Sequence, residues 1–345
     1  TYYNQTTRDL ELRIQPGIDK LDSGVDHIFN VDVMNGVNGQ DSPTFVASGD
    51  GGARMTATAM QRGAYDSAPL VISGVRHGII SQTSSLPSGN NSIQVALKFF
   101  TFVVNGTKLN ISGLQLTQTE DTDHLPVHGH GFANSGAWKR DEGSLELEVT
   151  QDLSPWYIET NDYVFTFSIV NPALGGYPPG VSVSASYVGK CSRTNISSDL
   201  TILPSQLQHA TGNAAALRIA GFHFLRMYQQ NASMEAENIQ YLDFMSYVTI
   251  HEGSILTVGG VSCSRCGCVE CCRFHIVSSE IQIGSNFSER DLLKFRETQD
   301  TKSALLQGQS VELDVHDTIV ADVAYVIPLH IKNNGCGHDS LTQVT

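Results

Sequence analysis

Apolar and polar side chains alternate along most of the chain with the period of a β-strand. In residues 29–33 and again in residues 165–169, every second residue is Phe, Ile or Val. Successive side chains of a strand point to opposite faces, so this pattern predicts strands with one face in a core and one in solvent. Asn-Gly follows the first segment and Asn-Pro the second, and such pairs end strands in turns.

The spacing of these strands, without amphipathic helices between them, predicts antiparallel sheets rather than βαβ units. One helix is expected at residues 288–298, where Ser288 and Asp291 make a capping-box-like start before an apolar stretch. The predicted fold class is therefore all-β, with tandem antiparallel, Ig-like β-sandwich modules and one short helix in the third module.

The strand pattern repeats along the chain. Leu10-Glu11-Leu12 matches Leu145-Glu146-Leu147, and Val311-Glu312-Leu313 begins a weaker third copy. After one inserted residue the first two copies stay aligned at a constant offset, in the pairs Asp26/Asp162, Phe29/Phe165, Val31/Phe167, Val33/Ile169, Asn35/Asn171, Gly39/Gly175, Pro43/Pro179 and Ser48/Ser184. The third copy continues through Tyr325, Ile327, Leu329, Ile331 and Asn333.

A second set of positions repeats between the first set's copies. It pairs Ala68, Leu70, Ile72 and Gly74 with Ala215, Leu217, Ile219 and Gly221, and Gly106, Leu109, Ile111, Gly113 and Leu114 with Gly253, Leu256, Val258, Gly260 and Val261. One offset serves all nine pairs, so both sets belong to one module. We expect an incomplete half-module at residues 1–66, a complete module at 67–212, and a module at 213–345 that carries a Cys-rich insertion and is incomplete at its C-terminal end.

A half sandwich exposes an apolar face and unpaired backbone groups, both of which are costly in water. The hypothesis that follows is head-to-tail strand exchange, in which the N-terminal half-module of one copy docks on the open C-terminal module of the next. Two alternatives stay open: the half-module packs on the central module of its own chain, or the chain is a fragment of a longer repeat array.

Charge and composition narrow the class of partner. The formal net charge is -14 and no basic cluster occurs, which disfavours a nucleic-acid partner. No apolar run reaches the length of a membrane span. The chain opens at Thr1 without Met or an apolar leader, and we therefore expect a processed or excerpted chain.

The N-glycosylation pattern Asn-x-Ser/Thr occurs more often than chance placement, which would give roughly three matches. This excess favours a secreted or cell-surface protein carrying N-linked glycans, although chance matches in an Asn-, Ser- and Thr-rich chain remain the alternative. Asn105 belongs to an Asn-Gly turn between two alternating segments, where a glycan would project into water. The acceptors are Asn4, Asn90, Asn105, Asn110, Asn195, Asn231 and Asn286.

The cysteines have two competing interpretations. Secretion favours disulfides, with three bridges and one thiol left over, whose pairing the sequence does not determine. A zinc site at the two Cys-x-x-Cys pairs is the alternative, but zinc sites normally combine pairs from distant parts of a chain. We therefore predict disulfides and no metal. The candidates are Cys191, Cys263, Cys266, Cys268, Cys271, Cys272 and Cys336.

Three histidines, His124, His128 and His130, offer imidazoles for zinc or copper, but they lie in an expected loop where solvation is the simpler interpretation. Asp50 in a Ser-Gly-Asp-Gly-Gly turn falls short of a calcium ligand set.

Three acidic residues, Glu120, Asp121 and Asp123, would serve glycoside hydrolysis only as a pair held across a cleft. A solvated acidic face is the favoured interpretation. No nucleophile elbow, zinc-protease helix or dinucleotide fingerprint occurs in the sequence. We therefore predict no enzyme, no catalytic residue and no cofactor; a glycan-active β-sandwich enzyme is the least favoured hypothesis.

Trp138, Trp156 and Tyr157 could stack on carbohydrate or fill the core. The first of these interpretations underlies the alternative function, a cell-surface adhesion or carbohydrate-binding repeat region.

Several short motifs of the second copy carry a resemblance to known proteins. They are Ile80-Ser81-Gln82-Thr83, Ile111-Ser112-Gly113-Leu114, Gly136-Ala137-Trp138, Leu145-Glu146-Leu147 and residues 165–172. Over most of residues 68–212 the chain resembles repeat units of very large secreted surface proteins of algae and other protists, and it is similar to protomers of extracellular glycoprotein fibrils of freshwater microorganisms. The resemblance implies a structural extracellular role without catalytic residues. The expected function is a protomer of a fibril or coat whose partner is itself, with glycans as a further possible partner.

Overall fold

The computed structural model describes residues 2–4, 9–13, 24–50, 54–63, 67–154, 162–188, 199–233, 237–259, 282–283, 295–297, 310–315 and 318–332. Within these ranges the chain forms strands in five sheets and no α-helix, apart from one 3-10 turn, η2 (Gly212–Ala214). The all-β prediction is thereby confirmed. Residues 1–36 and 37–345 are two compact units, and each is described by itself.

The predicted helix at residues 288–298 is wrong for its last turn. Phe295–Glu297 form strand β19, which pairs with Ser310–Val315 (β20). The rest of that range lies outside the described residues. The apolar spacing of Leu292, Leu293 and Phe295 fits a helix, but pairing with a second strand decides the conformation of so short a segment.

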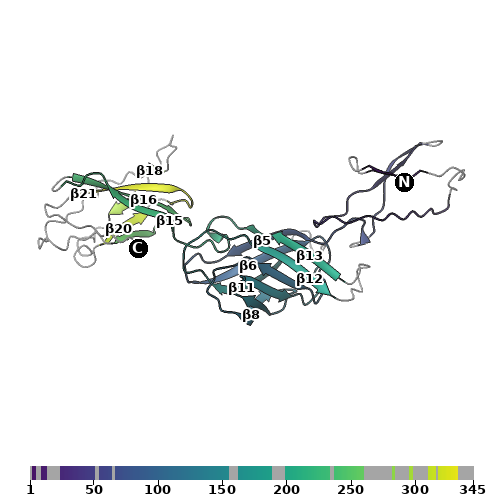
Figure 1. Cartoon of the computed structure of the whole chain (residues 1–345), viewed down its shortest axis with the longest axis horizontal. Coiled ribbons are helices and arrows are strands. Elements are labelled where there is room, and N and C mark those ends of the chain that lie inside the picture. The colour runs from purple at the N-terminus through teal and green to yellow at the C-terminus, as the bar shows by residue number, and fades with distance from the viewer. Residues whose placement is uncertain are drawn as a thin grey trace. The chain divides into compact units, whose positions relative to one another are not determined.

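The central body is one continuous sheet of ten strands, in the order β13-β12-β7-β10-β9-β8-β11-β6-β5-β14 (Figure 1). All neighbours are antiparallel except β14 and β5. The strands are β5 (Val75–Gln82), β6 (Asn90–Phe99), β7 (Lys108–Ser112), β8 (Thr122–Gly129), β9 (Ser135–Lys139), β10 (Ser144–Glu148), β11 (Tyr163–Val170), β12 (Ser182–Val188), β13 (Asp199–Gln206) and β14 (Gln208–His209).

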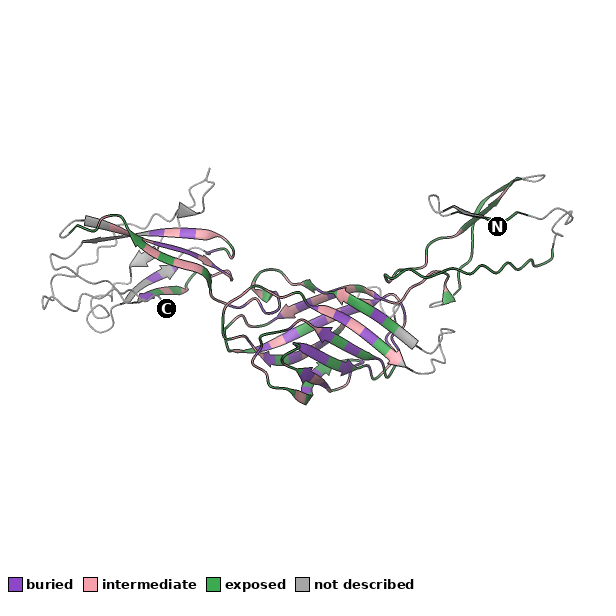
Figure 2. Ribbon diagram, in the orientation of Figure 1, coloured by how far each residue is buried: buried purple, intermediate pink, exposed green. Residues whose placement is uncertain are grey.

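A single core fills the space between the two halves of this sheet, which β8 joins. Buried and less buried residues alternate along β6 and β11, as the sequence pattern predicts for half-buried strands. Trp138, Phe165 and Phe167 are fully buried and in ring contact, and Figure 2 shows the buried residues gathered on these strands. The core draws on both halves of the sheet, so neither half is stable without the other.

The C-terminal body has two sheets around a smaller core. One has the order β15-β16-β21-β18 and the other β17-β20-β19. Leu242, Phe244, Leu313 and Ile327 are among the buried residues that they share. The strands not yet given bounds are β15 (Phe222–Gln229), β16 (Glu237–Ser246), β17 (Ile255–Gly259), β18 (Gln282–Ile283) and β21 (Ala324–Lys332).

Repeat-equivalent strands pair in equivalent register in the two bodies. Leu109 lies opposite Leu147 in the β7–β10 pair, and their counterparts Leu256 and Leu313 lie opposite each other in β17–β20. The same holds for Val95 with Phe165 in β6–β11, whose counterparts are Leu242 and Ile327 in β16–β21. The sequence repeat thus corresponds to a repeat of strand pairing.

The N-terminal segment differs from its counterparts. β1 (Tyr2–Asn4) pairs with β2 (Asp9–Glu11), and β3 (Val46–Gly49) pairs with β4 (Met55–Ala59). Residues 29–33 form no strand and are exposed, so the prediction of a half-buried strand there is wrong. Their counterpart β11 lies between β6 and β8, and no described strand flanks residues 29–33 in this way. An alternating pattern does not form a strand without partners for its backbone.

Candidate assembly surfaces

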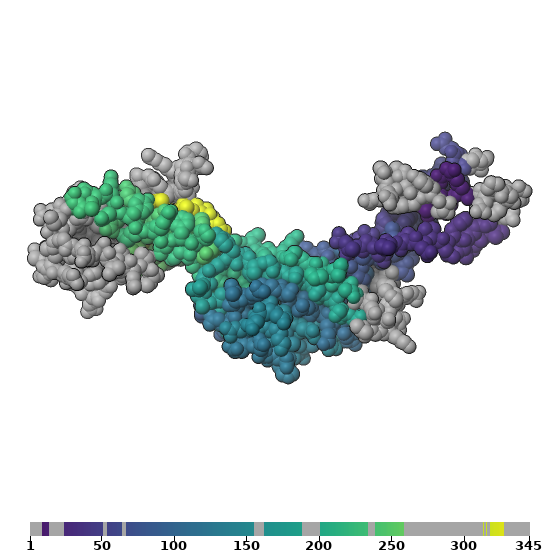
Figure 3. All heavy atoms as spheres, viewed as in Figure 1, coloured from purple at the N-terminus to yellow at the C-terminus, as the bar shows by residue number. Residues whose placement is uncertain are grey.

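An apolar strip runs along residues 25–34. It consists of Val25, Ile28, Phe29, Val31, Val33 and Met34, all of them exposed. Phe29 is 57% exposed and Val33 63%, whereas their counterparts Phe165 and Ile169 in β11 are 0% and 2% exposed. Figure 3 draws this segment in dark purple. A row of exposed apolar residues of this kind is a candidate interaction surface.

The β3–β4 hairpin repeats the β12–β13 hairpin of the central body in detail. Ala47 lies opposite Thr58 and Gly49 opposite Met55, with a bulge between these pairs; in β12–β13 the corresponding pairs are Val183/Ser205 and Ala185/Ile202, with the same bulge. The closing hydrogen bond also repeats: the Met60 amide donates to Phe45 O at 2.9 Å, and the Leu207 amide to Val181 O at 2.8 Å. The hairpin is therefore formed without the sheet on which its counterpart rests.

Two joints link successive repeats, and they have the same backbone geometry. In the first joint Gln40 and Ile72 exchange two backbone hydrogen bonds; in the second, Gly176 and Ile219 do so. A glycine pair lies beside each exchange. A Cβ atom on Gly39 would come within 2.6 Å of Gly74 Cα, and a Cβ atom on Gly175 within 2.6 Å of Gly221 Cα. Both joints therefore require glycine for close backbone approach.

A leucine with positive φ precedes each joint. Leu70 and its counterpart Leu217 both have φ 58°, a conformation that costs roughly 1–2 kcal/mol for a residue with a Cβ. The shared strain indicates that the surrounding contacts hold this turn in both copies.

The side chains of the two joints differ at equivalent positions. In the first joint Arg76 forms an ion pair with Asp41 and lies over the Phe100 ring. In the second, His223, Tyr177 and Tyr247 occupy the equivalent positions and form a cluster of ring contacts. Burial and the nearby Asp322 carboxylate raise the pKa of Tyr177. The first joint is therefore mainly ionic and the second mainly aromatic.

A buried amide network holds the chain that leads into the second joint. Gln82 donates to the carbonyl oxygens of Asn213 and Arg218, both at 2.9 Å, and accepts from the Leu217 amide at 2.8 Å. Asn91 donates to Gln82 at 2.9 Å and to Asn171 at 2.7 Å. The network thus binds the next repeat to the end of β5, with side chains that have no water to replace a lost partner.

The segment that carries Asn213 and Arg218 is also bound to the C-terminal body. Asn213 and the Thr249 backbone exchange two hydrogen bonds of 2.8 Å. Arg218 donates to Tyr247 O at 2.8 Å and forms an ion pair with Asp322 at 2.9 Å. Sequence reasoning overlooked this network, although Gln82/Gln229 and Asn91/Asn238 share the offset of the repeat and Asn171 was among the matched positions.

Gly175→Val is expected to open the second joint. Its side chain would meet Gly221 Cα and Ala220 O, and overpacking of this kind costs typically 1–3 kcal/mol. Hydrogen exchange at the Gly176 and Ile219 amides should rise by roughly tenfold or more, since 1.4 kcal/mol is a factor of ten. The matched control is Gly176→Ala, because nothing lies within 4 Å of a Cβ there. Equal exchange in both variants would mean that the glycine contact does not hold the joint.

The predicted glycosylation acceptors that the structure describes lie at the surface. Asn90, Asn105 and Asn110 are exposed, and Asn231 is half-buried. Asn105 and Gly106 form the predicted turn, with Gly106 at φ 85°. The side chain of Asn4 and the whole of Asn195 and Asn286 lie outside the described residues.

Asn110 lies on the outer face of β7, beside a surface ion pair. Lys108 donates to Glu146 at 2.6 Å, and this carboxylate raises the pKa of Lys108.

The histidine segment is a strand rather than the predicted loop. His124 and His128 are exposed on β8, where they alternate with the buried Leu125 and Val127. His130 follows in the turn and is hydrogen-bonded to Gln151 at 2.6 Å. Among the described residues, no group of three or more His, Cys, Asp or Glu side chains is arranged to hold a metal.

The acidic residues before β9 face solvent, as expected, and pair with basic residues. Glu120 forms an ion pair with Arg140 at 2.9 Å, and Asp121 accepts a hydrogen bond from the Arg140 amide at 2.8 Å. Asp123 lies 3.7 Å from Lys139. Asp50 is exposed.

Trp138 belongs to the core and not to a carbohydrate platform. It is 0% exposed, and its Nε1 donates to Thr119 O at 3.1 Å. The stacking interpretation is therefore wrong for this residue. Trp156, Tyr157 and all seven cysteines, Cys191, Cys263, Cys266, Cys268, Cys271, Cys272 and Cys336, lie outside the described residues.

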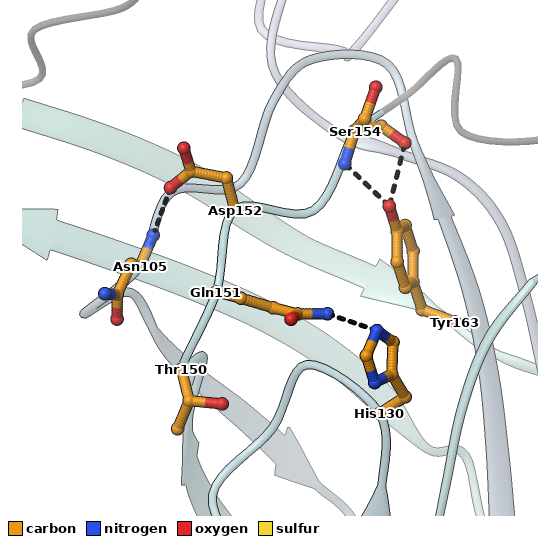
Figure 4. Close-up of a pocket in the computed structure, with 7 residues that line it drawn as sticks. All are labelled: Asn105, His130, Thr150, Gln151, Asp152, Ser154 and Tyr163. Carbon is orange, nitrogen blue, oxygen red and sulfur yellow. Dashed lines mark hydrogen bonds between the residues drawn. The ribbon is translucent and has the colours of Figure 1, made fainter.

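A polar hollow of about 510 Å³ opens at one end of the central body (Figure 4). Its wall is hydrogen-bonded within itself: the Asn105 amide donates to Asp152 at 3.0 Å, and the Ser154 amide donates to the Tyr163 hydroxyl at 2.7 Å. It carries one carboxylate, so it lacks the paired carboxylates of a glycosidase. The lining residues are Asn105, His130, Thr150, Gln151, Asp152, Ser154 and Tyr163.

No helix in the described part of the chain is long and apolar enough to cross a membrane. No protein-family model and no curated protein matches the sequence.

Proposed function

We propose that the chain is a structural protomer of an extracellular glycoprotein fibril or surface coat, which assembles head-to-tail. The observation that carries this proposal is the apolar strip. Its inward positions are exposed in the N-terminal segment and buried at the equivalent positions of the central body. Burying a side chain such as Phe or Val is worth roughly 1.5–3 kcal/mol, so covering the strip would drive association.

The repeated joints support a linear assembly of tandem Ig-like sandwich modules. Both joints use the same backbone exchange and the same close glycine pair. A unit that is joined to the next by one recurring geometry extends along a line. The resemblance to repeat units of secreted surface proteins has the same implication.

The surface positions of the glycosylation acceptors support an extracellular setting. Asn90, Asn105 and Asn110 leave their side chains accessible to a glycan, and such glycans would cover polar faces while the apolar strip stays available.

The direct test is self-association of the full chain secreted from a eukaryotic host. Multi-angle light scattering should give a mass that rises with protein concentration, and negative-stain microscopy should show filaments. The proposal would be overturned by a mass that stays monomeric at every concentration, together with slow hydrogen exchange at the amides of residues 25–34. That result would mean that the strip packs on its own chain.

A further inference from the structure

Among the described residues, the C-terminal body lacks counterparts of the β12–β13 hairpin and of β14. β20 and β21 already occupy the positions of β10 and β11. In the central body β7 lies between β10 and β12, whereas β17 lies at the edge of its sheet. Among the described residues, no strand pairs with the outer edge of β17. The free edge of β17 corresponds to the edge of β7 on which the β12–β13 hairpin lies.

The β3–β4 hairpin has the shape for this position and an uncovered inner face. Met55 is 63% exposed and Met60 55%, while their counterparts Ile202 and Leu207 in the central body are 1% and 5% exposed. On β17 the core-facing Leu256 is only half-buried, whereas its counterpart Leu109 in the central body is 0% exposed. The β3–β4 hairpin and the free edge of β17 therefore each leave apolar residues uncovered that the other could cover.

Neither β3 nor β17 carries the residues by which proteins prevent a further strand from adding to a sheet edge. β3 reads Val-Ala-Ser-Gly and β17 reads Ile-Leu-Thr-Val-Gly, without charge or proline. The edge strand β13 of the central body, by contrast, contains Asp199 and Pro204. Charged residues and proline protect an edge because they block the backbone ladder. β3 and β17 remain competent to pair.

Within one chain, the length of β5 separates the two joints that lead to the hairpin and to β17. The first joint adjoins Gly74 at the start of β5, and the second adjoins Gln82 and Ser85 at its end. A strand of eight residues spans roughly 26 Å at about 3.3 Å per residue. The hairpin and the C-terminal body are thus connected to opposite ends of β5.

We propose that the β3–β4 hairpin of one copy adds to the free edge of β17 in a second copy. This rests on the proposed self-assembly and adds to it a contact that is separate from the burial of the apolar strip. In the β12–β7 pair, Val183 lies opposite Ile111 and Ser184 opposite Asn110. Transfer of this register by the repeat places Ala47 opposite Val258, on the core side. It also places Ser48 opposite Thr257, on the solvent side, where Thr257 is exposed.

Disulfide trapping tests the register. One preparation carries Ser48→Cys and the other Thr257→Cys; they are mixed and oxidised, and the peptides that join positions 48 and 257 are quantified by mass spectrometry without reduction. Directly opposite residues have Cβ atoms within reach of a disulfide. The control mixes Ala47→Cys with Thr257→Cys, which face opposite sides, and we expect roughly tenfold less linked peptide from it. Fragment spectra of the linked peptide distinguish a bond at position 257 from one at the native Cys263, which lies on the same tryptic peptide.

A charge-reversal series provides a second measurement. Ser48→Lys combined with Thr257→Lys should weaken association by roughly tenfold, and Ser48→Lys with Thr257→Glu should restore it, because unlike charges pair across strands.

The outcomes separate this inference from the proposed function. Filaments without a 48–257 link above the control, and without charge rescue, would overturn the strand addition and leave the fibril proposal intact. A strictly monomeric chain would overturn both. Linked peptide at the predicted level together with charge rescue would establish the contact.

Discussion

Replacing Phe29, Val31 and Val33 together by serine is expected to abolish self-association of the chain. These three residues are the counterparts of Phe165, Phe167 and Ile169, which point into the core of the central body. Losing three buried apolar side chains removes roughly 5 kcal/mol of contact energy at about 1.5–3 kcal/mol each. Each 1.4 kcal/mol is a factor of ten, so the association constant should fall by about a thousandfold or more. Sedimentation velocity over a concentration series measures this directly.

The monomer should fold normally, because the three side chains are exposed in the chain by itself. The matched control replaces Ile28 and Met34 by serine. They are more exposed than Phe29, at 85% and 96%, but they correspond to Val164 and Val170, which are not core residues of β11. If both variants weakened association equally, the strip would associate through non-specific hydrophobic attraction and not as a strand with one face buried.

The contrast between residues 29–33 and β11 shows what the sequence pattern could predict. The two segments have the same alternation, and the pattern correctly predicts a half-buried strand in one case only. Alternation records which face a strand would bury. It does not record whether neighbouring strands are present to accept its backbone hydrogen bonds, as β6 and β8 do for β11.

The β8 strand was missed for a different reason. Its His, Pro and Gly residues are typical of a loop, and they concealed the buried pair Leu125 and Val127. Pro126 is tolerated because it pairs with Ser135 of β9 alone, while β11 pairs with β8 only from Val127 onward. Proline is acceptable where one side of the ladder is free, a condition that depends on how β8 joins the two halves of the sheet.

The joints between repeats show a further limit on what the sequence can predict. The paired glycines and Asn171 were found as repeat positions, but their purpose depends on contacts between residues far apart in the sequence, such as Gln82 with Arg218. A repeat identifies positions that serve the same role in each copy. Their role becomes clear only when the segment that they contact is known.

Asn171→Ala is expected to destabilise the central body by about 3 kcal/mol or more. The Asn171 side chain is 0% exposed; it donates to Ser84 O at 3.0 Å and Leu86 O at 2.9 Å, and it accepts from Asn91 at 2.7 Å. Removing it leaves buried groups without partners, at roughly 1–3 kcal/mol for each group that water does not reach. The loss should extend to the joint, because Asn91 in turn contacts Gln82.

Urea unfolding followed by tryptophan fluorescence measures this loss, since Trp138 reports on the core of the same body. The control is Asn134→Ala, which removes the same side chain from an exposed position between β8 and β9 and should change stability by no more than about 0.5 kcal/mol. Exchange of the Leu217 amide, which donates to Gln82, should quicken in Asn171→Ala and not in the control. Equal stability of the two variants would show that the amide network does not hold the repeats together, and that the recurrence of asparagine at this position needs another physical explanation.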